Sequence, residues 1–193
     1  VTTISIATLK VFDIVRAMEE AKRHAMALFF DKLSSSLRIH GIQLECRLPA
    51  APNTYLNYAV VSNVVQTIRS YPLTIEQEGH NLGTESEFPL VLGFRPSVSG
   101  FTDSGHENSL LQSLRTHLEK QNPKLIDGSH SNWPAGWIQL NQGPFTPENC
   151  ATFLGDEEKL CEVCRIIAEK VFKYVCVVED WLRKNPTVNQ VES

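Results

Sequence analysis

The sequence predicts an α+β fold in which long N- and C-terminal helices pack against a small antiparallel sheet of about four strands, with one shorter helix in the middle. Two amphipathic segments, residues 8–40 and 156–185, flank a middle region of alternating apolar and polar residues. A helix with an apolar stripe needs another element to cover that stripe, so this order favours helices packed on a sheet. We expect one domain over residues 1–193. Val1 in place of Met raises the alternative of a fragment or C-terminal region of a longer protein.

The first amphipathic segment, residues 8–40, has the spacing of a long helix. Its apolar residues recur at intervals of three and four and fall on one face: Val11, Ile14, Val15, Met18, Ala21, Ala25, Leu28, Phe29, Leu33 and Leu37. Gly41 suits the position just after a helix end, where a positive φ is common. The helix is therefore expected to stop near residue 40.

The second amphipathic segment begins after Asp156, whose carboxylate suits the N-cap of a helix. Its apolar face is broad, because Ile166, Phe172 and Val177 widen the stripe. Such breadth predicts burial on more than one side. The helix is then either central to the domain or a surface through which copies of the chain associate.

The region between the two helices contains several strand patterns. Residues 42–48 alternate strictly between apolar and polar side chains, which is typical of a half-buried strand. Residues 72–78 and 87–95 read as two further strands, and the glycine-containing stretch 79–83 between them indicates a hairpin. Residues 54–69 fit either a helix or a strand, and we favour a strand over 55–62.

Shorter elements follow. Ser104 to Glu107 has a capping-box pattern, which predicts the start of a short helix that ends before Pro123. Residues 137–140 supply one more short strand. Thr146 and Pro147 suit the cap and first residue of a short helical turn that ends at Gly155.

Composition excludes some classes of function. The chain has 18 basic and 22 acidic residues, a net charge of −4, so no general positive field attracts phosphate backbones, although a local basic patch is compatible with this balance. No apolar run approaches the roughly 18 to 20 residues of a membrane helix. The opening residues also lack the pattern of a signal peptide. We expect a soluble, cytoplasmic protein with no membrane partner.

The five cysteines are predicted to be reduced thiols. Their number is odd and three of them lie in one helical pattern, whereas secreted disulfide frameworks usually have an even number in loop-rich chains. Cys161 and Cys164 form a single CxxC, which can provide half of a zinc site or a redox pair. No second pair accompanies them in the sequence. We therefore interpret them as small buried hydrophobic residues, and we predict neither a metal nor a cofactor.

Weak catalytic candidates surround the predicted hairpin. His80 and His106 stand in polar loops, where an imidazole is accessible, and Glu76 and Glu78 belong to an acidic cluster that also contains Glu85 and Glu87. Converging carboxylates hold the cation of metal-dependent phosphodiesterases. The simpler interpretation is solvated histidines and a solvated, charged strand face.

Arg95, His106, Trp133 and Trp137 are the candidate binding residues. Arg95 precedes a glycine- and serine-rich loop that leads into a helix N-terminus, and a guanidinium there can clamp a phosphate or carboxylate. The two tryptophans can grip a peptide or stack on a base. The alternative for the loop is an ordinary helix cap, and for the tryptophans it is packing against the sheet.

No residue pattern identifies a family or a complete reaction centre. The first hypothesis is a non-enzymatic binding or regulatory module that engages a protein or nucleic acid, as an accessory domain of a larger protein. The alternatives are a metal-dependent phosphodiesterase or nuclease, and a small-molecule sensor with its ligand between helix and sheet. Self-association through the C-terminal helix fits the first hypothesis.

Overall fold

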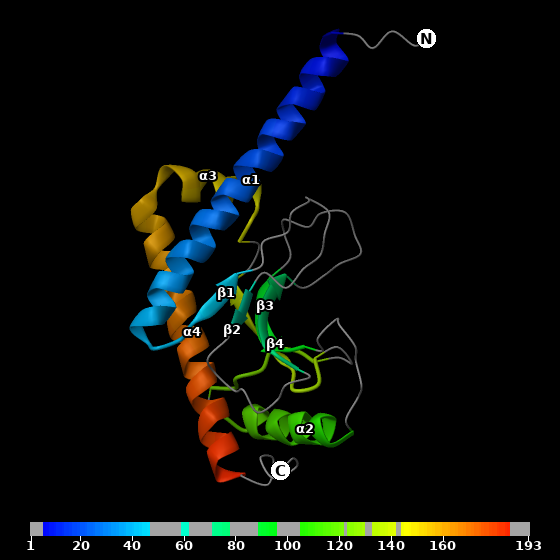
Figure 1. Ribbon diagram of the computed structural model, residues 1–193, viewed down its shortest axis with the longest axis vertical. Coiled ribbons are helices and arrows are strands. Elements are labelled where there is room, and N and C mark those ends of the chain that lie inside the picture. Colours follow the sequence, from blue (N-terminus) through cyan, green and yellow to red (C-terminus); the bar gives the residue numbers. More distant parts are fainter. Residues whose placement is uncertain are drawn as a thin grey trace.

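The computed structural model describes residues 6–46, 59–61, 71–77, 89–95, 105–121, 123–129, 133–141 and 144–185. Its elements, in chain order, are α1 (Ile6–Ile39), β1 (Leu44–Cys46), β2 (Ala59–Val61), β3 (Leu73–Gln77), β4 (Leu90–Phe94), α2 (Gly105–Glu119), β5 (Trp137–Asn141), α3 (Pro147–Gly155) and α4 (Glu157–Lys184). The long terminal helices, the central helix and the antiparallel sheet confirm the predicted α+β class (Figure 1).

The sheet has five strands in the order β1-β2-β3-β4-β5, one more than the four expected. Every neighbouring pair is antiparallel, and Ile75 of β3 lies opposite Leu92 of β4. The expected pairing of the strands within 72–78 and 87–95 is therefore confirmed. The turn predicted at 79–83 lies outside the described residues. In the ambiguous segment 54–69, the described residues 59–61 form β2, which agrees with the strand interpretation.

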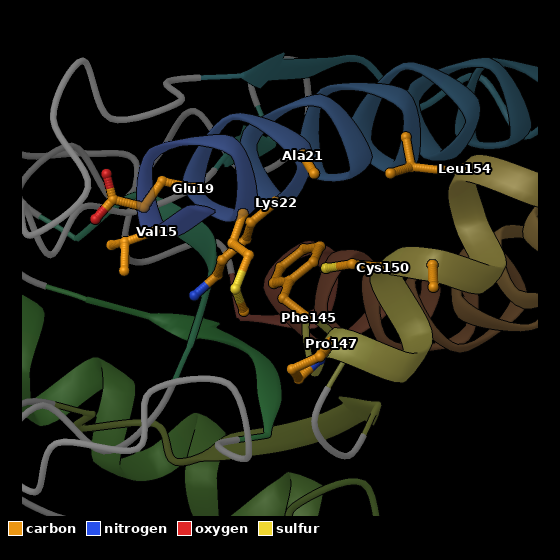
Figure 2. A pocket seen from close by; sticks show the side chains of 10 residues that line it. Val15, Glu19, Ala21, Lys22, Phe145, Pro147, Cys150 and Leu154 are labelled. Atoms are coloured by element: carbon orange, nitrogen blue, oxygen red, sulfur yellow. The ribbon is translucent and has the colours of Figure 1, made fainter. Parts of the chain in front are cut away.

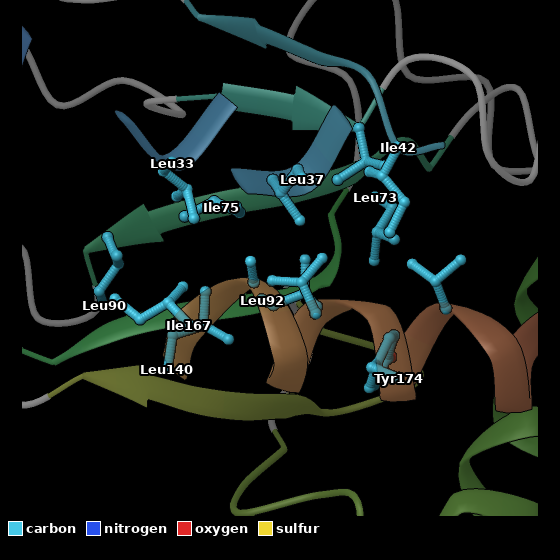
Figure 3. Close-up of a cluster of buried hydrophobic side chains, with 14 of the residues drawn as sticks. Leu33, Leu37, Ile42, Leu73, Ile75, Leu90, Leu92, Leu140, Ile167 and Tyr174 are labelled. Carbon is cyan, nitrogen blue, oxygen red and sulfur yellow. The ribbon is translucent and has the colours of Figure 1, made fainter. Parts of the chain in front are cut away.

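The core lies between one face of the sheet and the two long helices. Alternate residues of the central strands, such as Leu73 and Ile75 or Leu90 and Leu92, point at Leu33 and Leu37 of α1 and at Ile167 and Tyr174 of α4 (Figure 3). These side chains are essentially inaccessible to water. Alternation gives the strands one apolar face, and the three- and four-residue spacing gives each helix one. These apolar faces pack against each other in the core.

The predicted helix boundaries follow from local chemistry. α1 ends at Ile39, and Gly41 adopts a φ of 72°. The amides of Gly41 and Ile42 then donate to the carbonyls of Arg38 and Leu37, which satisfies two groups that the helix end leaves open. Thr146 caps α3 by accepting a hydrogen bond from the amide of Asn149. These expectations are confirmed.

Asp156 alone joins α3 to α4. Its backbone amide donates to the carbonyl of Thr152 at 2.8 Å and closes α3, while its carboxylate accepts from the amide of Lys159 at 2.9 Å and opens α4. The predicted N-cap is therefore confirmed. The same residue also terminates the preceding helix, so the two helices follow one another without a linker.

The broad apolar face of α4 is buried within the chain. Nine of its residues are buried, from Leu160 to Trp181. The large apolar side chains that α4 exposes are Ile166 and Phe172, and the Phe172 ring stacks on His40 at 4.5 Å between centroids. Of the two interpretations of this breadth, the structure favours a central helix.

Tyr174 offers a test of this core. Its hydroxyl is buried and has no hydrogen-bond partner among the described residues, and burial raises its pKa above the ordinary value. A buried hydroxyl without a partner costs free energy. We expect Tyr174→Phe to leave the free energy of unfolding at pH 7 unchanged or to raise it by about 1 kcal/mol, measured by urea denaturation.

The same variant has an expected pH dependence. A raised pKa in the folded state means that stability is present below the unfolded pKa of about 10 and is lost as pH rises above it. Wild-type stability should therefore begin to fall at about pH 10 and keep falling as pH rises further, and Tyr174→Phe should reduce that fall. A loss of more than about 1 kcal/mol at pH 7 would indicate that the hydroxyl has a partner.

Candidate interaction surface

Three of the predicted site residues meet on the face of the sheet opposite the long helices. Arg95, directly after β4, forms an ion pair with Glu76 of β3. The guanidinium carbon also lies 5.7 Å from the ring centre of Trp133, within the range of a cation–π contact. Glu76 and Trp133 are each 1% exposed. The cluster therefore packs inside the chain, with a cation that neutralises the buried carboxylate.

The expectation that Glu76 lies on a solvated strand face is wrong. Alternation places Glu76 and Gly93 on the face that the long helices leave uncovered, but Trp133 packs directly on Gly93. A β-carbon added at Gly93 would lie 2.6 Å from the Trp133 ring. Because Gly93 has no side chain, the Trp133 indole can pack on β4, and it buries this face of the sheet.

Trp137 lies on β5 and closes the outer edge of the sheet. Its amide donates to the carbonyl of Gly128 at 2.9 Å, and its carbonyl accepts from the amide of Asp127 at 2.8 Å. The Asp127 carboxylate also accepts from the amide of Gln139 at 2.6 Å. Because these groups are occupied, the Trp137 end of the β5 edge is not free to pair with an added strand.

The remaining catalytic candidates are not brought together in the described part of the chain. Glu78 and His80 lie outside the described residues, as do Glu85 and Glu87. His106 lies in the first turn of α2, and its side chain is not among those described. No group of three or more His, Cys, Asp or Glu side chains that could hold a metal ion occurs among the residues that the structure covers. The catalytic role of Glu78, His80 and His106 stays a prediction.

Cys161 and Cys164 differ sharply in environment. Cys161 is exposed, whereas Cys164 is buried in the second turn of α4 and its thiol donates to the carbonyl of Phe29 at 3.5 Å. Burial raises the pKa of Cys164 to about 12. A reactive or metal-binding cysteine needs a lowered pKa, since the thiolate is the reacting species. The environment of Cys164 therefore supports its interpretation as a hydrophobic core residue.

Thiol labelling tests this arrangement. At pH 7.5 a maleimide should label the three exposed cysteines, Cys46, Cys161 and Cys176, and spare Cys164 until urea unfolds the chain. Mass spectrometry of proteolytic fragments identifies the labelled residues. Labelling of native Cys164 as fast as Cys161 would contradict the packing of α4 against α1.

The N-terminal half of α1 carries an apolar surface that the described residues leave exposed. We define the α1 stripe as Val11, Ile14, Val15 and Met18, which lie on one face of the helix. Their exposed fractions run from 47% for Val15 to 60% for Ile14, and the adjoining Phe12 is 64% exposed. This part of α1 projects away from the other elements (Figure 1).

A pocket of about 460 Å³ adjoins the α1 stripe, between α1 and α3. Apolar groups form most of its wall, including Met18, Phe145 and Cys150, and the side chain of Lys22 stands at its border (Figure 2). Burial raises the pKa of the Cys150 thiol, and the nearby Lys22 cation partly opposes that rise. The pocket thus continues the apolar surface from α1 onto α3.

The sequence interpretation placed the α1 stripe in the core, and the structure corrects this. α1 residues become buried from Ala25 onward, while Lys10 to Met18 are exposed. Helix length was the missed signal. At 1.5 Å per residue, the 34 residues of α1 extend for about 50 Å, whereas a five-residue strand spans only about 17 Å. The sheet is too short to cover the whole helix.

Comparisons with known proteins add no functional information. No family model matches the chain, and neither a curated protein nor a solved structure shows significant similarity to it. None of the described helices combines the length and apolarity needed to cross a bilayer.

Proposed function

We propose that the chain is a non-enzymatic binding module that engages a protein through the α1 stripe. The observation that carries this proposal is the exposure of several large apolar side chains on one helix segment, next to an apolar pocket. Single exposed apolar residues are common on protein surfaces, but contiguous apolar patches mark contact sites. Such a module is suited to act as an accessory domain in a larger assembly.

A protein fits this surface better than a nucleic acid does. Nucleic-acid binding needs clustered cations that are free to contact phosphates. Beside the α1 stripe, Arg16 lies 3.6 Å from the Asp13 carboxylate, and on α4 three further cations, Lys159, Arg165 and Lys184, each lie within 2.7 Å of a carboxylate one turn away. The net charge of −4 also disfavours binding to the phosphate backbone of a nucleic acid.

Affinity capture tests the proposal. The wild-type chain, used as bait in extract from its source cells, should retain one or more proteins that the Val11→Glu/Ile14→Glu variant loses. Arg16→Glu is the matched control, since Arg16 is 73% exposed and lies on the opposite face of the same helix. Equal capture by all three baits would contradict a role for the α1 stripe. Binding of labelled DNA or RNA oligonucleotides with unchanged protein capture would favour the nucleic-acid hypothesis.

A second candidate, a small-molecule sensor, is favoured by the pocket itself. Its volume suits a small ligand, and its apolar wall, with the charged groups of Lys22 and Glu19 among the lining residues, suits an amphiphile. Anilinonaphthalene sulfonate is a suitable probe, and its fluorescence should rise with wild type. Ala151→Trp, which fills the pocket from α3, should abolish the rise, whereas an unchanged signal would place the probe elsewhere.

A further inference from the structure

The α1 stripe belongs to a helix segment that is poorly suited to stand alone in water. Val11, Phe12, Ile14 and Val15 are β-branched or aromatic and have low helix propensity. Most helix stability in proteins comes from packing of an apolar face, and this part of α1 has its apolar face exposed. A covering partner therefore stabilises both the apolar side chains and the helix that carries them.

The charges of this segment argue against a lipid surface or a strongly charged partner. Helices that lie on anionic membranes have a polar face rich in lysine and arginine. Here, cations and carboxylates are mixed and give a net charge of +1 over residues 10–23: Lys10, Asp13, Arg16, Glu19, Glu20, Lys22 and Arg23. Two copies of so nearly neutral a segment can approach each other with little electrostatic repulsion.

The spacing of the stripe is the same in both directions. Val11 and Ile14 are three residues apart, Ile14 and Val15 are neighbours, and Val15 and Met18 are again three apart. A two-fold axis between Ile14 and Val15 therefore maps the stripe onto itself in an antiparallel pair. Val11 of each copy then faces Met18 of the other, and Ile14 faces Val15. This is the self-complementarity that an isologous interface requires.

We propose that two copies of the chain pair through their α1 stripes in this antiparallel register. The pairing rests on the proposed protein-binding function, and its partner is a second copy of the chain. A specific interface buries at least about 1,000 Å² in total, and each copy contributes four apolar side chains that are about half exposed, so we expect an interface at the small end of the specific range. A dissociation constant in the micromolar range is expected. The pocket lies beside Met18, where Val11 of the second copy arrives.

Sedimentation velocity of the full chain over about 1 to 200 µM tests the pairing. Wild type should shift from 21.7 kDa toward twice that mass as concentration rises. Val11→Glu and Met18→Lys should each weaken pairing on the order of 10- to 100-fold. Both positions are more than half exposed, so neither change disturbs the core, and circular dichroism should show unchanged helicity. The matched control Arg16→Glu should pair like wild type.

An equimolar mixture of Val11→Glu and Met18→Lys tests the register. In the antiparallel pair the introduced glutamate faces the introduced lysine, so the mixture should form dimers at concentrations where each variant alone is monomeric. In a parallel pair, residue 11 would face residue 11 and the mixture would stay monomeric. Absence of this rescue would therefore overturn the antiparallel register.

The other outcomes separate this inference from the proposed function. A wild type that stays monomeric at 200 µM overturns self-pairing, as does a dimer that neither variant weakens. If a monomeric wild type still captures another protein in a stripe-dependent way, only self-pairing fails and the binding function stands. A wild type that neither dimerises nor captures a protein through the α1 stripe overturns both proposals.

Discussion

Arg95→Met is expected to lower the free energy of unfolding by about 3 kcal/mol, because it removes the cation that neutralises a buried carboxylate. The Glu76 side chain is 2% exposed and the Arg95 side chain 23% exposed, so water replaces little of the lost interaction. The substitution also removes the cation–π contact with Trp133. Urea denaturation monitored by circular dichroism measures the loss.

The double variant Glu76→Leu/Arg95→Met is the decisive control. Replacing both members of a buried ion pair by apolar residues of similar volume is often neutral or stabilising, because the cost of desolvating both charges disappears. We expect this variant to lie within about 1 kcal/mol of wild type. If Arg95→Met and the double variant are equally destabilised, the loss comes from packing against Trp133 and not from the charge on Glu76.

Gly93→Ala is expected to destabilise the chain by about 3 kcal/mol, the upper end of the usual cost of overpacking. The added methyl group would lie 2.6 Å from Cε3 of Trp133 and 2.7 Å from the carbonyl oxygen of Gly136. One neighbour is a buried ring and the other is backbone, so neither can yield by a simple rotation. A shift of the tryptophan emission should accompany the loss of stability as Trp133 moves.

Gly155→Ala is the matched control for that clash. Among the described residues, nothing lies within 4 Å of a β-carbon built at Gly155, at the end of α3. The change should therefore be neutral or stabilise by a few tenths of a kcal/mol, as alanine does in helices. A stability of Gly93→Ala equal to that of Gly155→Ala would contradict the packing of the Trp133 ring on β4.

Features decided by neighbouring residues were predicted well from the sequence. Gly41, Thr146 and Asp156 act through groups no more than four residues away, so their roles as helix boundaries follow from local chemistry. The strands β3, β4 and β5 lie close to their expected positions because alternation specifies a strand directly.

Features decided by distant residues were not predicted. The burial of Glu76 depends on Arg95, 19 positions later, and on an indole that packs where Gly93 has no side chain. The exposure of Val11 and Ile14 depends on how far the sheet extends, which no local pattern in α1 contains. An apolar stripe predicts that something covers a helix, but it does not say whether that cover belongs to the same chain.

The single-residue junction at Asp156 also has a mechanical consequence. A flexible linker would let α3 swing when a partner presses on it, and the contact would then stay local. Here a single residue separates the two helices, and α3 also packs against both α1 and α4, so few backbone rotations can reorient it. We therefore expect a partner that presses on α3 to act on α1 and α4 as well, and the α3 wall of the pocket to keep its position when the pocket is filled.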